Sequence, residues 1–136
     1  LIWEHAGELI QAHPWTGVGL RIPDELMNRE RMTEHGRIAV HSHMHNAYLQ
    51  IAAAMGLPAL LVFAWLVGSL FRLGRRAGRA RIRNLWEEGL VRAYPAILLA
   101  LLVNGLFEWN FGDSEILGLL YLLTGFVLGV ETDAQA

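Results

Sequence analysis

The sequence predicts an all-α polytopic membrane protein fragment with about three transmembrane helices and an outer segment that contains short helices. The run from Ala47 to Phe71 carries no charge and, at ~1.5 Å per residue, is long enough to cross a hydrocarbon core of ~30 Å. The composition agrees, because 54% of residues are hydrophobic and only 18% are charged, whereas proteins average about 25% charged residues. All the basic residues are arginines, and six of the 11 lie between Arg72 and Arg83, directly after this run.

The arginine cluster predicts how the chain is oriented. Short arginine-rich loops stay on the cytoplasmic side of a membrane, so residues 1–46 are expected outside and residues 74–92 inside. The same arginines are expected to contact anionic membrane lipids. We expect no nucleic-acid binding, because no aromatic platform is interleaved with them. We interpret the chain as the C-terminal part of a longer multi-pass membrane protein.

The outer segment is predicted to contain two short helices. Apolar residues recur at helical spacing from Ile2 to Ala12, and Pro14 ends this helix because the residue before a proline is pushed out of the α region. A loop with two glycines follows at 13–19, where glycine permits turns or close backbone approach. The second helix is predicted from Pro23 to about Glu34.

Three apolar segments account for the predicted spans. The first should kink or open at Gly56-Leu57-Pro58, because proline removes one helical hydrogen bond. Asn84, with Glu87 three residues later, is typical of a capped helix start. The predicted segments are an outer segment with the histidine motif at 1–46, transmembrane helices at 47–73, 93–107 and 116–130, an Arg-rich inner loop at 74–92, an outer turn at 108–115 and a tail at 131–136.

Three histidines lie just before the first residue of the first predicted span. His41, His43 and His45 alternate, so an extended chain would present them on one face. Asn46 is a good N-cap for the helix that follows. The positive end of that helix favours a neutral imidazole at His45, which suits a general base beside an anion site. Three interpretations stay open: a polar segment that only caps the helix, base catalysis, or a non-enzymatic metal-binding or transport module.

Other polar residues are candidates for the same outer site. A metal site would need further ligands such as His35, and nothing in the spacing indicates one, so no metal is expected. Glu108 could orient an imidazole, bind sugar hydroxyls, or simply be solvated. Asp113 is more consistent with capping the third span. Arg21, the outer arginine nearest the glycine loop, could pair with a phosphate.

Four motifs occur in the order found in a known family. They are Trp3 with the loop His13-Pro14-Trp15-Thr16-Gly17-Val18-Gly19; the stretch from His43 to Gln50; His45-Asn46 followed after nine residues by Gly56-Leu57-Pro58-Ala59; and Phe107-Glu108 with Gly112-Asp113. The third motif is similar to the pattern H-[NSQ]-x9-G-x-x-G, except that Ala59 replaces the second glycine. In these motifs the chain resembles the C-terminal part of the O-antigen ligase and polymerase family of bacterial surface polysaccharide assembly.

The resemblance implies glycosyl transfer without a metal or cofactor, at the periplasmic face of the bacterial inner membrane. The donor would be a glycan on undecaprenyl diphosphate, and the acceptor a sugar hydroxyl on lipid A–core for a ligase or on a growing glycan for a polymerase. The histidine spacing favours the ligase. His45 would take the acceptor proton, and the candidate substrate-binding residues are His43, Asn46, Arg21 and Glu108. Family arginines that hold the diphosphate correspond to positions before Leu1, so the chain alone is expected to be inactive.

Overall fold

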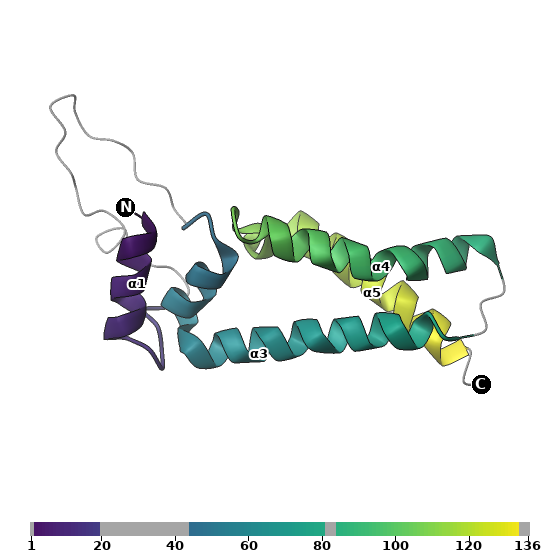
Figure 1. The fold of residues 1–136 in the computed structure, drawn as a ribbon, viewed down its shortest axis with the longest axis horizontal. Helices are drawn as coiled ribbons and strands as arrows, with labels where there is room; N and C mark the ends of the chain where they lie inside the picture. Colours follow the sequence, from purple (N-terminus) through teal and green to yellow (C-terminus); the bar gives the residue numbers. More distant parts are fainter. Residues whose placement is uncertain (1, 20–43, 81–83, 134–136) are drawn as a thin grey trace, which may run out of the picture. The chain divides into compact units, whose positions relative to one another are not determined.

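The computed structural model describes residues 2–19, 44–80 and 84–133, and these residues form helices without any strand. The helices are α1 (Ile2–Ala12), α3 (Ala47–Ala77), α4 (Leu85–Asn104) and α5 (Ser114–Asp133), with a short 3-10 turn, η1 (Asn110–Gly112) (Figure 1). The all-α prediction is confirmed, and α1 has the predicted bounds. The second predicted helix, at 23–34, lies outside the described residues.

The chain divides into two compact units. Unit 1 comprises Leu1–Val62 together with Leu106–Trp109, and unit 2 comprises Phe63–Gly105 with Asn110–Ala136. Unit 1 therefore contains α1, the first part of α3 and the short connection after α4. Its core forms where α1 packs on the beginning of α3, and the buried residues there are Ala6, Leu9, Met44, Ala53 and Ala54.

A sharp break divides α3 at Gly56. The backbone there has φ 84° and ψ 169°, a conformation open essentially only to glycine, and the chain changes direction (Figure 1). The sequence predicts that proline causes the interruption, but the break is at Gly56, and Pro58 lies in the first turn of the helical piece that follows. A proline is tolerated there because its missing N–H would have no helical partner. The piece from Leu57 to Ala77 alone extends about 31 Å at ~1.5 Å per residue.

The loop at 13–19 supplies the backbone partners that this break requires. Val18 N–H donates to Ala53 O and Gly19 N–H donates to Ala54 O, each at 2.9 Å. Leu57 N–H donates to Pro14 O at 2.8 Å. The last carbonyls of one helical piece and the first N–H of the next are therefore satisfied by the same loop. The loop and the broken helix form one structural element.

Two glycines make this close backbone approach possible. A Cβ at Gly17 would lie 2.3 Å from the carbonyl carbon of Ala54, and a Cβ at Gly56 would lie 2.6 Å from that of Trp15. Both glycines also have positive φ, 64° and 84°. Two separate reasons therefore disfavour a side chain at each position: the short contact of the Cβ and the positive φ.

Two of the described helices, α3 and α5, are long and apolar enough to cross a membrane. A further span is predicted at 93–107, and in the structure these residues belong largely to α4. That helix begins earlier, at the predicted cap Asn84, whose side chain accepts from Glu87 N–H at 2.9 Å. The N-terminal part of α4 thus includes the charged residues Glu87, Glu88 and Arg92. This charged beginning distinguishes α4 from α3 and α5.

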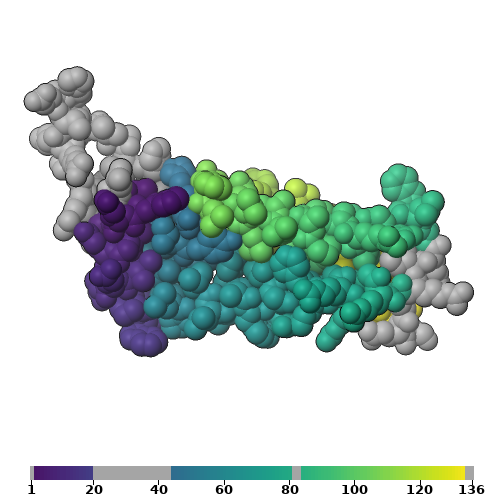
Figure 2. All heavy atoms as spheres, in the orientation of Figure 1, coloured from purple at the N-terminus to yellow at the C-terminus, as the bar shows by residue number. Residues whose placement is uncertain are grey.

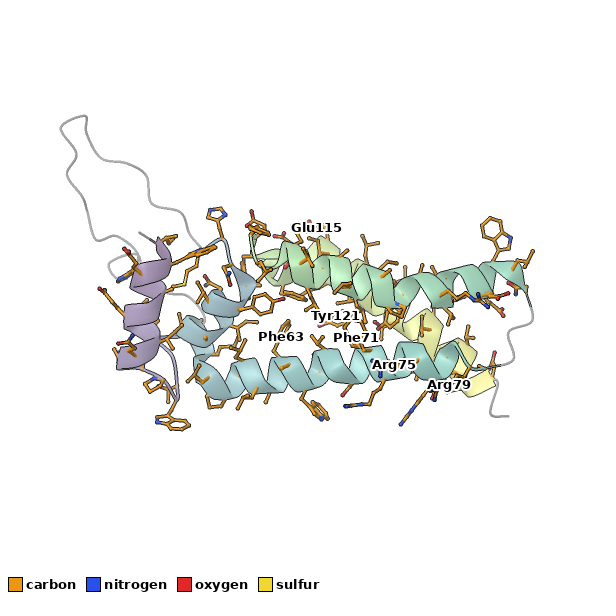
Figure 3. All side chains as sticks on the ribbon, viewed as in Figure 1. Phe63, Phe71, Arg75, Arg79, Glu115 and Tyr121 are labelled. Atoms are coloured by element: carbon orange, nitrogen blue, oxygen red, sulfur yellow. The ribbon has the colours of Figure 1, made fainter. Side chains whose placement is uncertain are left out.

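Unit 2 has its own apolar core. Tyr94 of α4 is fully buried, and its hydroxyl hydrogen-bonds Thr124 of α5 at 2.9 Å. Phe63 of α3 meets Phe111 of η1 edge to face, and Phe63 and Phe71 lie between α3 and the other two helices in Figure 3. The first residues of α4, at the right of Figure 2, project from the surface, and Trp86 is 90% exposed. Such an exposed tryptophan at a helix end is typical of a membrane interface.

Candidate active site at the start of α3

Asn46 uses both ends of its side chain: the oxygen caps α3, and the amide nitrogen binds the connection after α4. Its Oδ1 accepts from the N–H groups of Tyr48 and Leu49 at 3.0 and 2.9 Å, as the sequence predicted for an N-cap. Its Nδ2 donates to Leu106 O at 3.0 Å, which ties the connection after α4 to the helix start. Asn46 is only 7% exposed. The first free N–H groups of α3, which the sequence analysis regarded as an anion site, are therefore engaged by this asparagine.

The residue before His45 is fixed from three directions. Met44 is fully buried in the core of unit 1. Its N–H donates to Gln50 Oε1 at 3.1 Å, and its carbonyl accepts from Trp3 Nε1 at 3.1 Å. With Asn46 fixed on the other side, His45 is held in the left-handed region at φ 46°, where it is the only non-glycine residue among those described. Such strain, of order 1–3 kcal/mol, is typical of functional sites.

The imidazole of His45 faces a carboxylate from a distant part of the chain. Nδ1 lies 3.3 Å from each oxygen of Glu108. Glu108 Oε1 also accepts from the N–H of Trp109 at 2.9 Å. The two side chains are 37% and 44% exposed, so the pair is accessible from outside rather than enclosed. An accessible imidazole with its carboxylate partner can accept a proton from a substrate hydroxyl.

The structure brings together three of the five predicted site residues. His45, Asn46 and Glu108 lie within one unit and are linked by the contacts above. His43 and Arg21 lie outside the described residues, as do His41 and His35. Asp113 directly precedes α5, where its carbonyl accepts from Leu117 N–H at 3.0 Å, a capping position. In the described part of the chain, no group of three or more histidine and acidic residues could hold a metal ion.

Comparison with protein families adds an independent finding. The family model described as O-antigen ligase matches residues 1–64 of the chain. The resemblance inferred from the motifs is thereby confirmed, and a membrane glycosyltransferase-like role is supported at family level. No curated protein matches the chain.

The O-antigen ligase match covers α1, the glycine loop and the start of α3, but it ends before Glu108. Glu108 enters the site because the connection after α4 belongs to unit 1. The sequence did not predict three hydrogen bonds that fix the neighbours of His45. Trp3 Nε1 and Gln50 Oε1 bond Met44, and Leu106 O bonds Asn46. The only signal in the sequence for these contacts is the presence of Trp3 and Gln50 inside family motifs.

The two functions of Asn46 can be separated by substitution. Asn46→Asp keeps an oxygen for the helix cap but loses the amide that donates to Leu106 O, and it places a negative charge against that carbonyl. We expect Asn46→Asp to reduce glycan transfer in the full-length protein while abundance falls little. Asn46→Ala loses the helix cap as well, so its free energy of unfolding should be about 1 kcal/mol lower than that of Asn46→Asp. Thermal inactivation and transfer rates of the two variants measure this, and equal transfer by Asn46→Asp and wild type would contradict it.

Proposed function

We propose that the full-length protein transfers a glycan from undecaprenyl diphosphate to a sugar hydroxyl of an acceptor, and that His45 is the general base. The observation that carries the proposal is the exposed imidazole of His45, held in a left-handed backbone conformation beside Glu108 in the region matched by the O-antigen ligase family. Strained, fixed and accessible titratable groups are concentrated at catalytic sites.

The reaction is a displacement at the anomeric carbon of the donor sugar. His45 removes the proton of the acceptor hydroxyl as its oxygen forms the new glycosidic bond. The bond from the anomeric carbon to the diphosphate breaks, and undecaprenyl diphosphate leaves with the electron pair. Cations must stabilise the charge on that leaving group. The cap at Asn46 occupies the first N–H groups of α3, so we assign this role to arginine side chains, of which Arg21 is the candidate in this sequence.

The membrane setting supports a lipid-linked donor. The helices α3 and α5 are long and apolar enough to cross a bilayer. His45 directly precedes the first residues of α3, whereas Arg72, Arg75 and Arg76 lie in its last two turns and Arg79 follows its end. By the positive-inside rule, the arginine end is cytoplasmic and the His45 end faces the periplasm of the bacterial inner membrane. A site at the membrane surface lets the polyprenyl tail stay in the bilayer while the diphosphate and sugar reach His45.

The nature of the acceptor decides between ligase and polymerase. We expect the reconstituted full-length protein to transfer a labelled glycan from undecaprenyl diphosphate to lipid A–core, and to do so in EDTA. Elongation of the lipid-linked glycan instead would identify a polymerase of the same family. Loss of transfer in EDTA with recovery in zinc would favour a metal site that includes His41 and His43. Failure to transfer to either acceptor would contradict the proposed function.

A further inference from the structure

We propose that Glu108 is the positioning residue for His45: it fixes the imidazole tautomer with hydrogen on Nδ1, so that Nε2 takes the proton of the acceptor. This inference rests on the proposed function of His45 and adds a residue from outside the family match. The decisive contact is the 3.3 Å distance from Nδ1 to both carboxylate oxygens. An ionised carboxylate only accepts hydrogen bonds, so the nitrogen that faces it carries the hydrogen.

The carboxylate is held in place by the backbone. Glu108 Oε1 accepts from the N–H of the next residue, Trp109, at 2.9 Å. The carbonyl of Leu106, two residues earlier, accepts from Asn46 Nδ2 at 3.0 Å. Leu106 is thus bonded to the residue after His45, while the N–H of Trp109 holds the carboxylate itself, and all of these residues belong to unit 1. These two contacts orient the carboxylate toward His45 in the structure without substrate.

The exposure of the pair argues for positioning rather than for stability. With side chains 37% and 44% exposed, an ion pair of this kind contributes little to folding, about 0–1 kcal/mol. A carboxylate on Nδ1 has two chemical consequences that do not depend on burial. It selects the tautomer in which Nε2 carries the basic lone pair, and it stabilises the imidazolium that forms when the acceptor proton is taken.

Glutamine at this position separates the charge of Glu108 from its shape. In Glu108→Gln the side-chain oxygen that accepts from the N–H of Trp109 also lies 3.3 Å from Nδ1, so it can still accept a hydrogen bond from Nδ1–H. The amide carries no charge and stabilises the imidazolium less than a carboxylate does. We therefore expect kcat of Glu108→Gln to lie between those of the wild type and Glu108→Ala.

The kinetic test uses the full-length protein in proteoliposomes. We expect kcat to fall at least ~10-fold in Glu108→Ala, within the range of ~10–10⁴-fold for losing a residue that orients an imidazole, with little change in the KM for donor or acceptor. The matched control is Glu8→Gln, because Glu8 pairs with His5 on α1 at the same 3.3 Å distance. It should transfer at the wild-type rate. A rise in KM without a fall in kcat would instead assign Glu108 to substrate binding and overturn the inference.

A spectroscopic test reads the tautomer directly. ¹⁵N NMR of histidine-labelled protein, at a pH where the imidazole is neutral, distinguishes protonated from unprotonated ring nitrogens. The His45 signals are assigned by their loss in His45→Gln. We expect hydrogen on Nδ1 in the wild type and mainly on Nε2, the tautomer that imidazole prefers in water, in Glu108→Ala. The same tautomer in both proteins, or wild-type kcat in Glu108→Ala, would overturn the inference while the role of His45 stands, whereas rapid transfer by His45→Ala would overturn the proposed function itself.

Discussion

Replacing His45 with alanine is expected to nearly abolish glycan transfer by the full-length protein. Loss of a general base typically costs ~10²–10⁴ in rate. The fold should survive, because the helix cap is provided by Asn46 and the buried anchor by Met44, and neither contact uses the imidazole. Alanine also has a Cβ, so the backbone strain at φ 46° stays in the variant and does not by itself distinguish it from the wild type. Steady-state transfer to saturating acceptor measures the effect.

The controls for His45 separate catalysis from folding. Membrane insertion and abundance of His45→Ala should equal those of the wild type. His5→Ala removes an imidazole that also faces a carboxylate, Glu8, and should leave transfer unchanged. An equal loss in both variants would show that the effect arises from folding rather than from the proposed base.

Replacing Gly17 with alanine is expected to disrupt unit 1. The new Cβ would lie 2.3 Å from a backbone atom of Ala54, and the residue would have φ 64°. The left-handed backbone costs about 1–2 kcal/mol and overpacking about 1–3 kcal/mol, and their sum approaches the lower end of the stability of folded domains, about 5 kcal/mol. The hydrogen bonds from Val18 and Gly19 to α3 would be displaced as well. Gly56→Ala should act similarly, because its Cβ would lie 2.6 Å from Trp15.

The measurement is the resistance of residues 1–64 to limited proteolysis and thermal inactivation in detergent. Gly7→Ala is the matched control, because Gly7 lies within α1 and has nothing within 4 Å of its added Cβ. Replacing a glycine inside a helix with alanine, where the added Cβ meets nothing, stabilises the helix by about 0.5–1 kcal/mol. Gly17→Ala and Gly7→Ala should therefore shift stability in opposite directions, and equal behaviour would contradict the interlocked arrangement of the loop and α3.

Local signals in the sequence predicted the helices well. Side-chain periodicity and Pro14 gave α1 its bounds, and the caps at Asn46 and Asn84 were evident because asparagine at these positions has a direct physical function. The break in α3 was expected within Gly56-Leu57-Pro58, but its form was not. Glycine and proline both interrupt helices, and only the hydrogen bonds to the loop at 13–19 show that Gly56 turns the chain.

The site was predictable only in part, because its supports are distant in sequence. His45 and Asn46 are adjacent, so a motif identifies both. Glu108 is 63 residues from His45, and the sequence left its role open between orienting an imidazole, binding sugars and solvation. The indole of Trp3 and the carbonyl of Leu106 act through backbone hydrogen bonds. A single sequence has no pattern for such contacts, since they depend on how the helices pack.

The central claim is that His45 removes the proton of the acceptor hydroxyl. The most direct measurement is the single-turnover rate of transfer by His45→Gln with saturating donor and acceptor, because it isolates chemistry from binding and product release. Glutamine can form hydrogen bonds but cannot take up a proton at neutral pH. The account predicts a rate reduced at least ~10²-fold, with donor binding unchanged. A rate within about tenfold of the wild type would contradict it, because loss of a general base costs more.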